Sequence, residues 1–334
     1  MLWVRSGQGM AMCYSAQIWA DYRKYERLGG TLDIKGYTAL AGWTRKKGTW
    51  TKVVPKAMRR SMLDAGALAP DLSAIALAAD AESVAVIRQD IADLSERRAQ
   101  AQAKLSSAKP TKKAENDLRI STNKIQAAQR KLDDMAAPPE PDGNDRIWPG
   151  HFAPVLICDP DSGERLIVPM RYRCRLPGWT VADESEKPGT YNARRDKLST
   201  VWRNVFGVHH GLIAANRFYE SVHLHDLQQR ALAPGEREQS VELVFTPQGG
   251  EDLLIACLYT RTEADGDAPA FYSFAAITDD PSPEVAAAGH DRCIVTIREE
   301  DISAWLDPLA TGRDELLAIL DRAQHPYYEH ELAK

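Results

Sequence analysis

The fold is decided by the stretch Ala153-Pro154-Val155-Leu156-Ile157-Cys158, Asp159-Pro160-Asp161-Ser162-Gly163 and, after two charged residues, Leu166-Ile167-Val168-Pro169-Met170. Two short apolar runs on either side of Asp, Pro, Ser and Gly are typical of two β-strands joined by a tight turn. Four more apolar runs follow, at Val241–Thr246, Leu253–Leu258, Phe271–Ile277 and Cys293–Ile297. Short strands separated by turn residues predict an α+β fold with a mostly antiparallel, barrel-like β core.

Helices are predicted around this core, one directly after Cys13, one around 197–204 and one around 299–306. Residues 73–135 differ, because they are rich in Ala, Gln, Lys, Arg and Glu and contain no Gly. Apolar residues recur there in steps of three, four or seven, at Val84, Ile87, Ile91, Leu94, Leu118, Ile125 and Leu132. These repeats, broken near Pro110, predict an antiparallel coiled-coil hairpin inserted into a single catalytic domain over 12–320.

Bulk composition limits the classes of function. The chain has 334 residues, of which 44% are hydrophobic and 27% charged, as in a globular protein. Its net charge of −5 gives no overall attraction to nucleic acid, so DNA binding requires a local basic surface. No apolar run approaches the roughly 20 residues of a membrane helix, and the N-terminus lacks a signal pattern. We expect a cytoplasmic monomer with no membrane contact.

The cysteines argue against a metal or disulfide framework. They are odd in number, widely spaced and without a C-x-x-C pair: Cys13, Cys158, Cys174, Cys257 and Cys293. Free thiols indicate a reducing compartment. The pairs His209-His210 and His223-Leu224-His225 have no Cys or acidic ligand at helpful spacing, so neither a metal nor another cofactor is expected.

The predicted hairpin is basic near its tip. Between 97 and 131, ten basic residues stand against only Glu115 and Asp117, and they are Arg97, Arg98, Lys104, Lys109, Lys112, Lys113, Arg119, Lys124, Arg130 and Lys131. One interpretation is an ordinary solvated coiled-coil surface. The other is a contact with a DNA backbone or a protein partner, without base stacking because no aromatic residue is interleaved.

Cys13 directly follows Met12. A terminal cysteine would carry an α-amine and a thiol, two nucleophiles whose reference pKa values are about 7.8 and about 8.5. An aldehyde can form a Schiff base with the amine, and the thiol can then close a thiazolidine ring. Residues 1–11 precede Met12. This chemistry therefore requires either a start at Met12 followed by removal of that methionine, or cleavage of the leader before Cys13. Otherwise Cys13 is an ordinary cysteine near the start of a helix.

Five motifs follow Met12-Cys13 in order, at Met170–Trp179, Tyr191–Asp196, Gly211–Glu220, His290–Val295 and Trp305-Leu306. Together they resemble the SOS response-associated peptidase (SRAP) family, whose motifs read M-R-W-G-L-I-P-x-W, N-A-R-x-E, C-L-I-P-A-D-G-F-Y-E-W, H-x-R-M-P-V and W-L. The resemblance covers Met12 to about Pro308, apart from the hairpin. The chain departs from the family at Tyr14 (usually Gly), Asp196 (usually Glu) and Ser221 (usually Trp).

The resemblance implies a set of site residues. The catalytic ones are Cys13, Asn192, Glu220 and His290. Glu220 would act as acid or base, His290 would protonate or hold the sugar oxygen, and Asn192 would donate to a developing oxyanion. The DNA-binding ones are Arg194 and Arg292 for phosphate, with Trp179 and Tyr172 for base stacking. Each has a plainer interpretation, as a salt bridge, core histidine, turn residue, solvated arginine or core aromatic.

The family resemblance implies a protein that crosslinks covalently, through Cys13, to abasic sites in single-stranded DNA. A second interpretation is a cysteine peptidase in which Cys13 attacks an amide with help from Glu220 and His290. A third is a non-catalytic DNA or partner adaptor that works through the basic hairpin.

Overall fold

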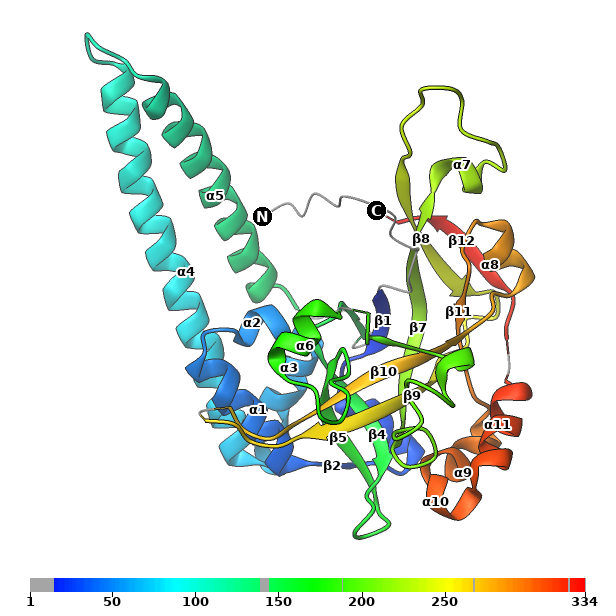
Figure 1. Cartoon of the computed structure of the whole chain (residues 1–334). Coiled ribbons are helices and arrows are strands. Elements are labelled where there is room, and N and C mark those ends of the chain that lie inside the picture. Colours follow the sequence, from blue (N-terminus) through cyan, green and yellow to red (C-terminus); the bar gives the residue numbers. More distant parts are fainter. Residues whose placement is uncertain (1–14, 139–143, 188, 267, 324, 334) are drawn as a thin grey trace.

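The computed structural model describes residues 15–138, 144–187, 189–266, 268–323 and 325–333. Five strands form a closed ring in the order β5–β4–β7–β9–β10 and back to β5. Their bounds are β4 Phe152–Cys158, β5 Arg165–Tyr172, β7 His210–His223, β9 Leu253–Thr262 and β10 Phe271–Asp279. Every pair in the ring is antiparallel except β5 with β10, which is parallel. The predicted α+β fold with a barrel-like core is confirmed (Figure 1).

The β4–β5 hairpin forms where the sequence predicts it. The side chain of Asp159 accepts a hydrogen bond from the backbone N–H of Ser162 at 3.1 Å, an Asx turn that competes with further strand pairing. Gly163 then has a φ of +72°, a left-handed conformation that residues with a Cβ rarely adopt. The two strands are almost wholly buried because both faces of the barrel wall are covered.

Shorter strands extend the ring into one sheet. β1 (Ser15–Trp19) lies between β7 and β3 (Asn144–Ile147), and β8 (Ser240–Pro247) lies between β7 and β12 (Tyr328–Leu332). The other short strands are β2 (Thr31–Leu32), β6 (Asn192–Arg194) and β11 (Cys293–Ile294). Because β12 pairs with β8, the sheet continues beyond residue 320, where the sequence analysis ended the catalytic domain.

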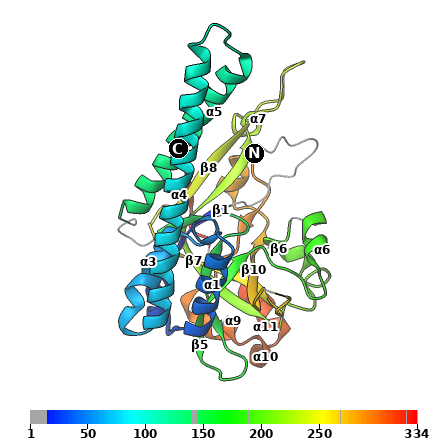
Figure 2. The same cartoon turned by 90° about the vertical axis from the view of Figure 1, so that its left-hand side faces the viewer.

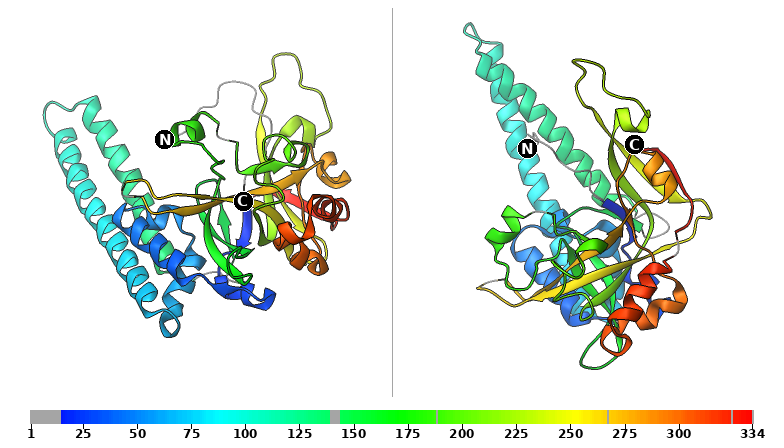
Figure 3. Two further views of the ribbon diagram at one scale, coloured as in Figure 1. Left: turned by 60° about the horizontal axis from the view of Figure 1, so that its bottom comes forward. Right: turned by 45° about the vertical axis from the view of Figure 1, so that its right-hand side comes forward.

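Helices cover the barrel in two groups (Figures 1 and 3). Those near the N-terminus are η1 (Tyr22–Leu28), α1 (Ile34–Lys46), α2 (Trp50–Val53), α3 (Lys56–Asp64) and η2 (Ala65–Ala67). Those near the C-terminus are η4 (Glu299–Asp301), α9 (Ile302–Leu306), α10 (Pro308–Thr311) and α11 (Arg313–Asp321). Short connecting helices are α6 (Val181–Glu186), η3 (Arg195–Lys197), α7 (Leu224–Leu227) and α8 (Pro283–Ala287). The predicted helix around 299–306 is confirmed.

The helix predicted directly after Cys13 is wrong, because Ser15–Trp19 forms strand β1. Tertiary pairing explains the difference. Both backbone edges of β1 are hydrogen-bonded, one to β7 and one to β3, and this placement buries Ile18 and Trp19 completely or almost so. The first helical turn comes later, at Tyr22, where the side chain of Asp21 caps it.

The helix predicted around 197–204 is also wrong. η3 ends at Lys197, and a series of hydrogen-bonded turns follows over 198–208. Four side chains of this stretch are buried, at the i, i+4, i+7 and i+8 spacing of one helix face: Leu198, Trp202, Val205 and Phe206. The backbone nevertheless forms successive hydrogen-bonded turns, such as Phe206 N–H to the Trp202 carbonyl at 2.8 Å, and no continuous helix.

Residues 70–136 form an arm of two antiparallel helices, α4 (Pro70–Leu105) and α5 (Lys112–Ala136), which projects from the barrel (Figures 1 and 2). Small side chains lie buried between the helices, at Ala101, Ala114 and Ser121. Thr111, directly after Pro110, caps α5 by accepting from the N–H of Ala114 at 3.2 Å. The apolar repeats therefore pack as the sequence indicates.

The base of the arm is fastened to the body by Asp80 of α4. Its carboxylate accepts from Trp50 Nε1 at 2.8 Å and from Arg59 Nη1 at 2.5 Å. Arg59 is buried, so its charge needs this partner. A second, exposed pair joins Arg45 to Glu82 at 2.6 Å. In the part of the chain that the structure describes, no helix is long and apolar enough to cross a membrane.

Candidate functional site

Glu220 and His290 form a fully buried pair. Glu220 Oε2 lies 3.1 Å from His290 Nε2, and neither side chain is exposed to solvent. The other ring nitrogen, Nδ1, donates to the backbone carbonyl of Arg292 at 2.8 Å, because a carbonyl oxygen can only accept. That bond fixes the orientation of the imidazole and leaves Nε2 directed at the carboxyl group.

The two facing atoms lie 3.1 Å apart but are not joined by a hydrogen bond of ordinary geometry. Nδ1 of His290 keeps its own proton for the Arg292 carbonyl, so Nε2 and Glu220 Oε2 would both present lone pairs if neither were protonated. In a dry interior that contact would be repulsive, and a proton on either atom makes it attractive. Burial lowers the pKa of His290. A buried pair of this kind can deliver or accept a proton.

The backbone around each member explains its position. Along the end of β7 the side chains of Phe218, Glu220 and Val222 alternate inward, as the two-residue period of a strand requires. His290 follows α8 through Gly289, whose φ is +90°. A Cβ on Gly289 would lie 2.7 Å from Cβ of Asp226, so this turn needs glycine to bring His290 inward.

Asn192 lies near this pair by strand pairing. β6 and β11 both pair with the second half of β10, with Asn192 opposite Ala276 and Ile294 opposite Thr278. Ala276, Ile294, Glu220 and Ser15 line one small cavity of about 20 Å³, with room for about one water molecule. Asn192 is itself buried. Three of the four predicted catalytic residues thus come from separate parts of the sequence to one end of the barrel, and Cys13 lies outside the described residues.

The two predicted phosphate-binding arginines meet around Asp291. Arg292 is buried and contacts the Asp291 carboxylate at 3.0 Å, while Arg194 is half-exposed and contacts Asp196 at 2.9 Å. Burial tends to raise the pKa of Asp291, but its hydrogen bond to Arg292 and the charges of Arg292, His290 and Arg194 lower it overall. Arg194 remains available to an outside phosphate. The sequence analysis allowed a solvated Arg292, but the structure encloses this side chain beside His290.

The two predicted stacking aromatics have different environments. Tyr172 is 6% exposed and packs in the core against Phe274, at a centroid distance of 5.2 Å, and against Tyr191 at 6.0 Å. The prediction that an exposed base stacks on Tyr172 is therefore replaced by packing of this ring in the core. Trp179 is only partly buried, with Lys187 Nζ 4.9 Å from its ring centroid, so one face remains open to a partner.

Arg146 of β3 is a site residue that the sequence analysis missed. Its guanidinium donates to Ser15 Oγ at 2.7 and 2.9 Å, pairs with Glu242 at 2.5 Å and lies 3.6 Å from the ring centroid of Tyr219. Arg146 thereby ties the first described residue of β1 to the strand that carries Glu220. No motif marks this residue, because the contact depends on the pairing of β3 with β1.

Replacing Arg146 by Ala should lower the free energy of unfolding by about 2 kcal/mol. The change removes charge-assisted hydrogen bonds and a cation–π contact that are only partly exposed. Urea unfolding followed by circular dichroism measures the difference. Arg261→Ala is the matched control, since the Arg261–Glu263 pair is exposed and should contribute less than about 0.5 kcal/mol. Equal losses in the two variants would contradict the stabilising role of the Arg146 contacts.

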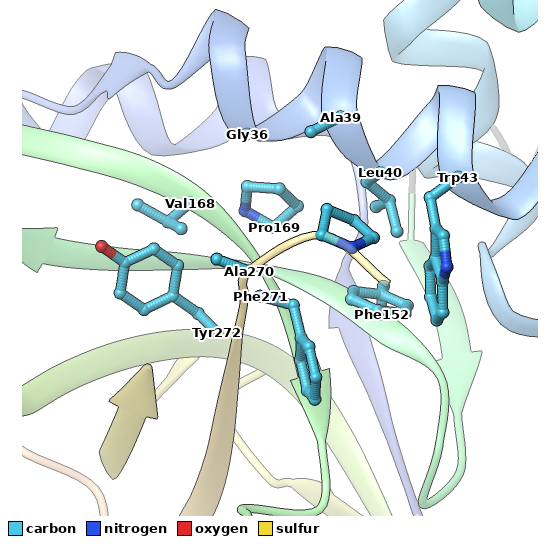
Figure 4. A pocket seen from close by; sticks show the side chains of 11 residues that line it. Gly36, Ala39, Leu40, Trp43, Phe152, Val168, Pro169, Ala270, Phe271 and Tyr272 are labelled. Carbon is cyan, nitrogen blue, oxygen red and sulfur yellow. The ribbon is translucent and has the colours of Figure 1, made fainter. Parts of the chain in front are cut away.

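A second cavity, of about 60 Å³, lies between α1 and the strands β4, β5 and β10 (Figure 4). Trp43, Phe152, Pro169 and Phe271 point into it. Among the described residues its lining contains no carboxylate, amine, thiol or imidazole, so it offers no acid–base chemistry.

Comparisons with known proteins agree with the motif order. The model of the family described as "SOS response associated peptidase (SRAP)" matches residues 111–333. No curated protein matches the chain. Similar solved structures include a protein from Bordetella bronchiseptica, with 22% identity over 62% of this chain and 95% of that one, and a TM-score of 0.43.

Two further solved structures are similar at the same TM-score of 0.43. A phage-related protein from Bordetella bronchiseptica has 19% identity over 57% of this chain and 81% of that one. A protein from Bacteroides thetaiotaomicron has 13% identity over 57% of this chain and 78% of that one. Because the family model extends over more than half of the sequence and includes Asn192, Glu220 and His290, this chain belongs to the SOS response associated peptidase (SRAP) family.

Proposed function

We propose that this protein forms a covalent crosslink between Cys13 and abasic sites in single-stranded DNA. The observation that carries the proposal is the buried Glu220–His290 pair, whose facing atoms lie 3.1 Å apart near the end of β7, the strand that pairs with β1. Family membership supports an enzyme of the SOS response. The protein shields a reactive sugar by bonding to it.

The proposed reaction needs no reactant other than groups of the chain and the opened sugar. An opened abasic deoxyribose exposes an aldehyde, and the α-amine of Cys13 adds to its carbon to give a carbinolamine. Loss of water leaves a Schiff base, and the Cys13 thiol then adds across the C=N bond to close a thiazolidine. The products are the crosslink and one water molecule. Both the ring opening and the loss of water need a proton delivered to oxygen.

The roles of the site residues follow from this sequence of steps. The Glu220–His290 pair supplies and recovers the proton. Asn192 donates a hydrogen bond to the oxygen on which charge develops. Arg194 holds a phosphate beside the sugar, where a guanidinium can bind two oxygens at once. The buried Arg292 positions His290 through its backbone carbonyl. Trp179 stacks on a neighbouring base.

Chain connectivity supports the part given to Cys13. Ser15 is in register with Tyr219, the neighbour of Glu220. Cys13 precedes Ser15 by two residues, which extend at most about 7 Å. That length is within reach of the Glu220 carboxyl group.

The described thiols are poor alternatives to Cys13. Cys174, Cys257 and Cys293 are buried, and burial raises the pKa of each, to about 12 for Cys174. Cys293 also feels the charge of Glu220, which further disfavours its thiolate. Cys158 is half-exposed, but its pKa is also raised, first by desolvation.

The proposal also implies which form of DNA is preferred and which parts of the chain belong to the active protein. A sugar must enter a narrow site, so single-stranded DNA is preferred to a paired duplex. Residues 73–135 are an insertion into the catalytic domain. Residues 1–11 and Met12 are absent from the active form, because a blocked α-amine cannot close the ring.

Expression of two forms, one starting at Met12 and one at Met1, tests the proposal. Each is mixed with a single-stranded oligonucleotide that carries one abasic site, and a heat-stable shifted band is sought on a denaturing gel. The Met12 form should give the band, and Cys13→Ala should abolish it. Intact mass should show crosslinked protein minus one water. A band from Cys13→Ala, or none from any form, would overturn the proposal, and cleavage of a peptide substrate without a band would favour a cysteine peptidase.

A further inference from the structure

The arm concentrates positive charge in a protein whose net charge is negative. Ten basic and two acidic residues lie between 97 and 131, whereas the whole chain has a net charge of −5. The whole arm, residues 70–136, is nearly neutral, with eleven basic and ten acidic residues. The positive charge of its outer part is therefore a local attraction for a polyanion that the overall charge would not predict.

The basic residues of α5 form two rows along the helix. Lys112, Arg119 and Arg130 follow each other at intervals of seven and eleven residues, which return to one face of a helix. Lys113, Lys124 and Lys131 repeat the same intervals in the opposite order. Each row runs about 27 Å, since a helix rises 1.5 Å per residue.

The first row faces away from the partner helix. Ala114 and Ser121 of α5 are buried against α4, and positions 112, 119 and 130 lie on the opposite side of the helix. Lys112, Arg119 and Arg130 are all exposed. This row is therefore not needed to hold the arm together.

Among the described residues, the row forms no ion pair with an acidic side chain, and the one ion pair made by the basic residues of 97–131 is Arg97 with Asp117. Arg119 donates to the neutral side chain of Asn116 at 2.8 Å. The row has acidic neighbours three or four residues away on the helix, at Glu115, Asp133 and Asp134. Because none of these carboxylates pairs with the row in the described ranges, its exposed charges can contact an external anion.

The arm extends toward the side of the barrel that carries the site. In Figures 1 and 2, the free end of the arm and the end of β7 that bears Glu220 rise on the same side of the molecule. A nucleic acid that enters at the Glu220–His290 pair and continues outward can therefore run beside α5.

We infer that the row Lys112, Arg119 and Arg130 binds the phosphate backbone of nucleic acid that flanks the crosslinked site. The inference rests on the proposed function for its substrate. The arm has no aromatic residue between 70 and 136, so it contacts phosphates and does not stack on bases. Such contacts add affinity without sequence preference.

The test compares a row variant with a control of equal charge change. Lys112→Gln, Arg119→Gln and Arg130→Gln are combined in the full chain, since Gln retains helix propensity. The control combines Lys35→Gln, Arg203→Gln and Arg298→Gln, which are exposed positions on the body. Fluorescence anisotropy measures binding to intact oligonucleotides of roughly 8 and roughly 30 nucleotides, single-stranded and with a flanking duplex, at several salt concentrations.

For the longer oligonucleotides, the row variant should bind at least about tenfold more weakly at low salt. The slope of log K against log salt should fall by about 2 for three lost phosphate contacts, and the 8-nucleotide affinity should stay unchanged. The control should keep the wild-type slope. Equal weakening in both variants would reduce the effect to net charge and overturn the inference. Unchanged binding by the row variant would also overturn it and assign the row to an acidic protein or an anionic membrane surface.

The experiments distinguish a wrong inference about the arm from a wrong proposal about the covalent crosslink. The short oligonucleotide with an abasic site should form the covalent band equally with wild type and the row variant. If the band forms but the salt slopes coincide, the arm inference fails and the crosslink stands. If no band forms, binding to intact DNA still measures the arm.

Discussion

Glu220→Gln should slow formation of the covalent band with abasic single-stranded DNA by about 10²–10⁴-fold, the usual contribution of a positioned acid–base group. Gln has almost the same shape as Glu, so the packing against Phe218 and the cavity wall should persist. The amide cannot take up and release a proton, as a carboxyl group 3.1 Å from His290 Nε2 can. Single-turnover gel kinetics with the Met12 form measure the rate, and thermal unfolding checks that the variant is folded.

Asp301→Asn is the matched control for Glu220→Gln. Asp301 is another buried carboxylate, paired with Arg322 at 2.7 Å on the C-terminal side of the barrel, away from the site. Its loss should reduce stability and leave the crosslinking rate of the folded protein unchanged. A wild-type rate in Glu220→Gln would remove this residue from the chemistry. Equal rate losses in the two variants would assign the effect to stability.

Acid should destabilise the protein through His210, by roughly 2–3 kcal/mol between pH 7 and about pH 4.5. His210 is 1% exposed, and its Nε2 accepts from the N–H of Gly207 at 2.8 Å, which only the neutral ring can do. Burial lowers its pKa from 6.5 to about 3. Between these values the unfolded chain binds the proton and the folded protein does not, so the free energy of unfolding falls as pH falls.

The His210→Phe variant should lose stability at pH 7, because the Gly207 N–H is left without its acceptor, but should show a flatter pH dependence. Urea unfolding at pH 7 and at about pH 4.5 gives both quantities for each protein. His330→Phe removes an exposed imidazole and keeps His210, so the loss at acid pH should persist. If His210→Phe loses as much unfolding free energy in acid as the wild type does, groups other than His210 control the pH dependence.

The strands and the arm were predictable because their signals are local. The runs around Val155 and Ile167 with the turn at Gly163 specify a hairpin from neighbouring residues alone, and the heptad steps of 84–132 specify two helices. The two misassigned segments are 15–19 and 197–204. Strand pairing determines the first, whereas the second keeps the residue spacing of a helix face but forms successive turns.

The order of the motifs predicted which residues form the candidate site but not how their side chains lie. The motifs named Asn192, Glu220 and His290, and the register of β6, β7 and β11 brings them to one end of the barrel. Tyr172 and Arg292 were expected to face DNA, but burial encloses both. Whether a side chain faces in or out of a closed barrel depends on strands far away in sequence. Arg146 was missed for the same reason.

The sequence alone determined the class of fold, the position of the arm, the excess of positive charge over 97–131 and the family to which the chain belongs. These properties depend on residue type and on spacing along the chain. Only the tertiary structure decided that His290 Nε2 meets Glu220 Oε2, that Arg146 ties Ser15 to Tyr219, and that one basic row of α5 faces outward. Hydrogen bonds and proton sharing act over about 3 Å, and folding alone brings residues this close when 70 or more positions separate them in the chain.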